Sequence, residues 1–111
     1  MNWKNRRKFQ PYKKSDTRYT DPLYLQWRDS VKRRDKNTCQ MPNCDKKGYL
    51  ECHHIKRWAD QPLLRYNKMN GIMLCKQHHK SVKDKEYIYE SIFMRIAAQN
   101  EVAWINSQLK K

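Results

Sequence analysis

The sequence predicts a small α+β domain. Its hydrophobic core is too small to be stable without a bound metal ion or disulfide bonds. Only 38% of its 111 residues are hydrophobic, and domains of this size bury a limited apolar surface. Residues 49–55 show the alternating pattern of a β-strand, and residues 72–74 suit a second strand. Before and after these two segments, apolar residues recur at helical spacing. All four cysteines and all four histidines fall between residues 39 and 79. We expect three parts: a basic arm over 1–19, a central domain over 20–85 and a helical extension over 86–111.

Residues 1–19 are predicted to form a flexible basic arm. They carry seven Lys or Arg residues against the single acid Asp16, and aromatic residues are interleaved with them. No apolar period runs through this stretch. Such an arm can track phosphates, with Arg6, Arg7 and Lys8 as candidate contacts. A tail whose charge only aids solubility is the alternative.

The first helix is expected to begin at Asp21-Pro22 and to end near Lys36. Asp21 can cap free backbone N–H groups, and proline suits the first helical position. Leu23, Trp27 and Val31 recur four residues apart, which predicts one buried stripe. At the helix end, Arg33 and Arg34 can reach phosphate or remain a solvated end.

The centre of the chain reads as strand, turn, strand and helix. Residues 49–55 form the first strand, and Asn70-Gly71 is the strongest hairpin-turn dipeptide in the chain. Residues 72–74 return as the second strand, and a helix is expected from Cys75 to about Val82. Past residue 85, Ile88, Ile92 and Ile96 have helical spacing, and Tyr89, Phe93 and Ala97 follow them at the next positions. Asn100 is a candidate break in this helix. Residues 102–109 suggest a short last helix.

Composition favours a polyanion as partner. The net charge of +14 exceeds what solubility requires, and nucleic acid suits such a field better than a membrane surface does. No stretch is apolar enough for a membrane span or a secretory leader. A cytoplasmic location is expected, and there clustered cysteines and histidines indicate metal ligands before disulfides.

Four of these side chains have the spacing of a structural zinc site. Cys39 and Cys44 close a short proline-containing loop, and Cys75 and His78 supply a second pair at a two-residue gap. Together they predict a closed Cys3His site, which would pin the upstream loop to the downstream helix. The alternative is that these residues are unrelated.

Three histidines are left over. His53 and His54 are adjacent on the predicted strand, so their side chains point to opposite sides and cannot readily share one ion. One can bind a divalent ion while the other faces an attacking water, since imidazole accepts a proton near neutral pH. His79 can close the metal site from the helix.

Over roughly residues 30–85 the chain resembles the HNH endonuclease family. The resemblance rests on His53-His54-Ile55, on Asn70-Gly71-Ile72 leading into Leu74-Cys75, and on His79, all wrapped by zinc pairs. It implies a zinc-stabilised ββα-metal core flanked by helices. The implied roles are His54 as general base, His53 and His79 as ligands of one catalytic divalent ion, and Asn70 holding the loop that carries His54. In some relatives the residue equivalent to Asn70 is itself a metal ligand. A 5′ phosphate and a 3′ hydroxyl are the implied products.

Some assignments stay open on the residues alone. His79 on zinc with His78 catalytic is a rival arrangement, because many relatives have a cysteine where this chain has His78. Cys52 is either a buried strand cysteine or a further ligand. Lys56 and Arg57 follow the first strand and can grip the scissile phosphate or remain solvated. The divalent ion is expected to be Mg²⁺ or Mn²⁺, with Ni²⁺ or Zn²⁺ as alternatives.

The leading hypothesis is therefore a metal-dependent endonuclease acting on double-stranded DNA. The resemblance is closest to small phage-encoded members, which suggests host cytoplasm and a phage packaging or replication partner. A monomer or weak dimer is expected, and a monomer with one active site would nick. The alternatives are a non-catalytic zinc-stabilised nucleic-acid-binding module and a binuclear zinc cluster without chemistry.

Overall fold

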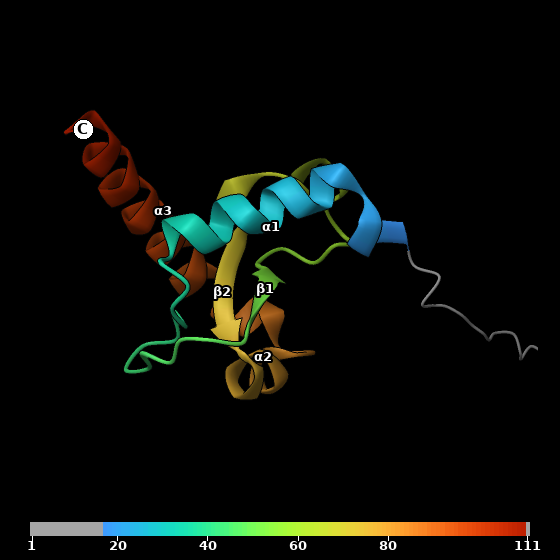
Figure 1. Cartoon of the computed structure of the whole chain (residues 1–111). Coiled ribbons are helices and arrows are strands. Elements are labelled where there is room, and N and C mark those ends of the chain that lie inside the picture. The colour runs from blue at the N-terminus through green and yellow to red at the C-terminus, as the bar shows by residue number, and fades with distance from the viewer. Residues whose placement is uncertain (1–16, 111) are drawn as a thin grey trace, which may run out of the picture.

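Two antiparallel strands and three α-helices make up the part of the chain that the structure describes. This structure, a computed structural model, describes residues 17–110 (Figure 1). After a 3-10 turn at Thr17–Thr20, the elements are α1 (Pro22–Arg34), β1 (Leu50–His54), β2 (Gly71–Cys75), α2 (Lys76–Val82) and α3 (Glu86–Leu109). The α+β class and the order strand, strand, helix are as the sequence predicts. No helix within the described range is long and apolar enough to cross a membrane.

Strand β2 is the centre of the core. All five of its residues are buried, and it pairs with β1 from Leu50 opposite Cys75 to His54 opposite Gly71. Ile72 and Leu74 pack in a cluster that includes α3, whereas Met73 packs against α1. Because side chains alternate along a strand, β2 is covered on both faces and holds the helices together.

Helix α1 starts as its sequence predicts, but Tyr24 rather than Leu23 completes its buried face. The Asp21 side chain accepts a hydrogen bond from the Leu23 N–H, and Pro22 occupies the first turn. Leu23 is 53% exposed, while Tyr24, Trp27 and Val31 are buried. Spacings of three and four place Tyr24 on the Trp27–Val31 face and leave Leu23 at its margin. The prediction that Leu23 is buried is wrong.

Arg34, expected as a phosphate contact, is instead part of the core. Its side chain is fully buried beside Asp35, with Nε 2.8 Å from the Asp35 carboxylate. Its other nitrogens donate to the carbonyls of Lys68 (2.8 Å) and Gly71 (2.7 Å). Asp35 in turn accepts from the Met73 N–H at 3.0 Å. A buried guanidinium requires such partners, so Arg34 ties α1 to β2 and is unavailable to DNA.

The expected tight hairpin at Asn70-Gly71 is absent. Two 3-10 turns, Pro62–Leu64 and Lys68–Asn70, interrupt the long connection between the strands. Gly71 has φ −128°, an extended value, whereas the two-residue hairpin turn expected for Asn-Gly needs positive φ at both residues. Glycine is required there for another reason: a Cβ atom would lie 2.6 Å from Val31 and 2.7 Å from Trp27.

The C-terminal region is one helix rather than two. Asn100, expected to break it, lies inside α3 and donates through Nδ2 to Asp35 (3.0 Å) and Gln40 (2.9 Å). Its amide therefore serves tertiary contacts instead of capping the backbone. Phe93 and Ala97 are the buried residues of α3, and the last turns of α3 extend away from the core (Figure 1).

Candidate functional site

Cys39, Cys44, Cys75 and His78 come together as one ligand set. Their ligand atoms all lie within 4.8 Å of one another. The His78 Nδ1 atom is 3.6 Å from the Cys39 sulfur and 3.3 Å from the Cys75 sulfur. Ligands of a tetrahedral zinc ion are separated by about 3.5–3.8 Å, given the usual Zn–S and Zn–N bond lengths. The predicted Cys3His group is thus positioned to hold a structural metal ion such as zinc.

Local backbone structure supports this group at both ends. The Cys39 N–H donates to the Lys46 carbonyl (2.8 Å) and the Cys44 N–H to the Met41 carbonyl (2.9 Å), which closes the first loop. Cys75 ends β2 and occupies the N-cap position of α2, so His78 lies within the first turn of the helix. Burial alone would raise the pKa of the Cys75 thiol, but the His78 N–H and the neighbouring thiols lower it. This balance favours the thiolate that binds metal.

His79 lies outside the Cys3His group, which decides between the two arrangements open from the sequence. Its Nδ1 atom contacts a carboxylate oxygen of Glu51 on β1. Its ring centroid is 5.3 Å from that of His53. Adjacent residues of one short helix therefore face two different sites, and His78 belongs to the cysteine cluster.

His53 is buried, and one of its ring nitrogens lacks a hydrogen-bond partner among the described residues. It is 5% exposed, and its Nε2 atom has no hydrogen-bond partner among the described residues. Burial lowers the pKa of His53 to about 3, and the charges of His79 and His54 add to the shift. The ring is therefore neutral at ordinary pH, the form that binds metals. A buried nitrogen without a partner, close to a second histidine, fits a metal ligand.

His54 points to the other side of β1 and is held by aromatic residues. Its ring stacks on Trp27 at 3.9 Å, with Trp58 edge-on at 5.3 Å. Its Nε2 atom lies 2.9 Å from the backbone carbonyl of Arg65. A carbonyl only accepts, so the proton lies on Nε2 and the lone pair of the neutral ring on Nδ1.

One cavity of about 320 Å³ brings all three histidines together despite these opposite directions. Its other lining residues come from the start of the described chain, α1, β1, the loop after β1 and the first turn of α3. They are Tyr19, Tyr24, Cys52, Arg57, Trp58, Ala59 and Glu86. We call this the histidine cavity. It is the mixed polar and aromatic hollow in which catalytic groups are usually found.

Asn70 holds the loop that follows His54. Its Oδ1 atom accepts from the Lys56 N–H at 2.7 Å, and its Nδ2 atom donates to the carbonyls of Lys56 (3.1 Å) and Leu64 (3.2 Å). The side chain is almost fully buried, at 2% exposure. These contacts fix the loop after β1, and Asn70 does not lie at a hairpin turn.

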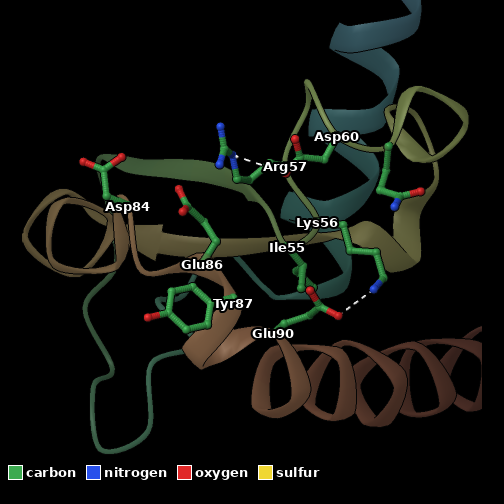
Figure 2. A pocket seen from close by; sticks show the side chains of 9 residues that line it. Ile55, Lys56, Arg57, Asp60, Asp84, Glu86, Tyr87 and Glu90 are labelled. Carbon is green, nitrogen blue, oxygen red and sulfur yellow. Dashed lines mark hydrogen bonds and ion pairs between the residues drawn. The ribbon is translucent and has the colours of Figure 1, made fainter.

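The candidate phosphate contacts have different surroundings. Arg33 is exposed, and Lys56 pairs with Glu90. Arg57 lies 3.6 Å from Asp60 and lines both the histidine cavity and a neighbouring cavity rich in acids (Figure 2). Arg6, Arg7 and Lys8 lie outside the described residues.

Three partners of the histidines were not predicted from the sequence. Glu51 contacts His79, Trp27 stacks on His54 and the Arg65 carbonyl meets the same ring. The position of Glu51, two residues before His53 on a strand, is a signal that could have placed it on the same face. Cys52 lines the histidine cavity, and burial raises the pKa of its thiol far above the ordinary value. A thiol that resists ionisation fits a strand cysteine better than a metal ligand.

The chain was compared with protein-family models, curated proteins and solved structures, and none of them matches it.

Proposed function

We propose that this protein is a metal-dependent endonuclease of the HNH type that hydrolyses phosphodiester bonds in double-stranded DNA. The observation that carries the proposal is the histidine cavity. Three histidines that the Cys3His group does not use line it. His54 and His79 have polar contacts that orient their rings, and the buried Nε2 atom of His53 has no hydrogen-bond partner among the described residues. The formal net charge of +14 supports a polyanionic substrate.

His54 is the proposed general base. With its Nε2 proton donated to the Arg65 carbonyl, Nδ1 carries the lone pair that accepts a proton from water. The water oxygen bonds to phosphorus while the bond from phosphorus to the 3′ oxygen breaks. The products are a 5′ phosphate and, after protonation by solvent, a 3′ hydroxyl. Stacking on Trp27 fixes the plane of the His54 imidazole before the substrate binds.

His53 and His79 are the proposed ligands of the catalytic cation. A bound Mg²⁺ or Mn²⁺ would neutralise negative charge on the phosphate oxygens. The neutral, partnerless Nε2 atom of His53 supports this role. The Cys3His group, by contrast, would hold zinc and orient the helix that carries His79.

The test is plasmid cleavage in the presence of Mg²⁺ or Mn²⁺. The wild-type protein should convert supercoiled DNA to nicked circles, and a monomer should give little linear product. His54→Ala should slow cleavage by about 10²–10⁴-fold, the usual contribution of a general base. Zinc content and DNA binding should be unchanged in this variant, which separates loss of chemistry from loss of fold.

A zinc-stabilised module that binds nucleic acid without cutting it is the competing function. It predicts DNA binding with no cleavage by the wild-type protein under any divalent ion. Cleavage by His54→Ala at the wild-type rate would contradict the role of His54. Mapping the ends on a long duplex reports the products, the strandedness and any site preference together, and an RNA duplex in parallel tests the choice of DNA.

A further inference from the structure

We infer that Glu51 is a positioning residue: it holds the His79 ring so that Nε2 is presented to the cation of the histidine cavity. This inference rests on the proposed cation site and adds to it a residue outside the three histidines. Its first test requires no DNA cleavage.

The strand pairing places Glu51 under helix α2. Glu51 lies opposite Leu74, and Leu50 lies opposite Cys75, where β2 ends and α2 begins. His79 is four residues beyond Cys75, so one helical turn later its side chain lies on the same side of α2 as Cys75 and is directed toward β1. The Glu51 carboxylate meets the His79 Nδ1 atom there. Both side chains are about one-third exposed, at 33% and 35%.

The chemistry of the two groups then fixes the tautomer. An ionised carboxylate has no proton to donate, so the hydrogen bond requires the proton on Nδ1 of His79. In the neutral ring the lone pair is left on Nε2. Glu51 thus selects which nitrogen can bind a metal.

A carboxylate in this position also has an energetic effect on a metal site. It stops rotation of the ring and makes the ligating nitrogen more basic, and loss of such a partner typically lowers metal affinity by about 10–100-fold. A simple surface ion pair would contribute little to stability and nothing to metal affinity. Metal affinity and tautomer therefore distinguish positioning from a surface pairing.

The first experiment reads the tautomer directly. Ring NMR spectra of isotopically labelled histidine are recorded on the full chain with its structural zinc, without other divalent ions, and well above the ordinary imidazole pKa of about 6.5. We expect His79 to carry its proton on Nδ1 in the wild type and to lose this preference in Glu51→Ala. A wild-type ring protonated on Nε2 would overturn the inference.

The second experiment measures Mn²⁺ affinity from the paramagnetic resonance signal of the free ion. Glu51→Ala should weaken binding by about 10–100-fold, with Glu51→Gln in between because its amide oxygen still accepts. Glu90→Ala is the matched control: it removes one carboxylate, which pairs with Lys56 and does not line the histidine cavity. It should leave the affinity and the tautomer unchanged.

The outcomes separate this inference from the proposed function. Equal Mn²⁺ affinity in the wild type and Glu51→Ala overturns the positioning role alone. Wild-type binding that is absent, or unaffected by His53→Ala, overturns the cation site and the inference with it. If Glu51→Ala does not fold, Glu51→Gln is compared with Glu90→Gln. Weaker binding in the first supports the inference, and equal affinity overturns it.

Discussion

Helix α2 contributes one histidine to each of two regions, which differ in burial and in the contacts of that histidine. The Cys3His group takes His78 and includes two almost fully buried cysteines, Cys39 and Cys75. The histidine cavity takes the next residue, His79, which is about one-third exposed and contacts Glu51. The first region closes on itself, whereas the cation site that we propose in the second would leave ligand positions open. Closed metal sites are structural and open ones are catalytic, so neighbouring residues are expected to fail in different ways.

The largest effect is expected from the adjacent pair His78 and His79. His78→Ala should release zinc and unfold the domain, because structural zinc contributes roughly 10–16 kcal/mol in small zinc domains at neutral pH. His79→Ala should keep zinc, far-UV circular dichroism and melting temperature, and lose cation binding in the cavity. Removing zinc from the wild type with a chelator should reproduce the first result. A chelated protein that retains its fold would show that the core stands without the metal.

The next effect is expected from the buried pair Arg34 and Asp35, which ties α1 to β2. Arg34→Met removes the donors to Lys68 and Gly71 and leaves Asp35 charged and buried. We expect a loss of roughly 3–5 kcal/mol in the free energy of unfolding, measured by urea denaturation. Arg33→Met, at the exposed neighbouring position, should change stability by about 0.5 kcal/mol or less. Unchanged stability with weakened DNA binding would instead return Arg34 to the role that the sequence indicates.

The smallest effect is expected on the side of the histidine cavity. Gly71→Ala places a methyl group against Val31 and Trp27, and overpacking of this kind costs roughly 1–3 kcal/mol. Because Trp27 stacks on His54, cleavage should fall while zinc content stays unchanged. With Val31→Ala added, the total loss of stability should be smaller than the sum of the two single losses, since the new methyl group then fills part of the space left by Val31. Additive losses in the double variant would contradict the contact.

Residue spacing is enough to predict the closed region. Cys39 and Cys44, with Cys75 and His78, are pairs close in sequence, so their spacing alone indicates the ligand set. The cap at Asp21 and the two strands are similarly local features. The choice of His78 over His79 follows from the usual two-residue gap, and the Cys3His geometry confirms it.

The open region depends on contacts between distant residues, which spacing does not encode. The Arg65 carbonyl and Trp27 reach His54 from two different segments. The mistaken predictions for Arg34 and Asn100 have the same origin. Local propensity assigns Arg34 to solvent and Asn100 to a helix break, and tertiary hydrogen bonds override it.

The stack of Trp27 on His54 has an optical consequence. An indole ring in face contact with an imidazole, at 3.9 Å between centroids, loses fluorescence when that imidazole gains a proton, because the imidazolium quenches the excited indole. Trp27 is buried, so its emission lies at shorter wavelength than that of solvated tryptophans. The protein therefore carries a built-in reporter of the protonation state of its proposed base, readable without label or substrate.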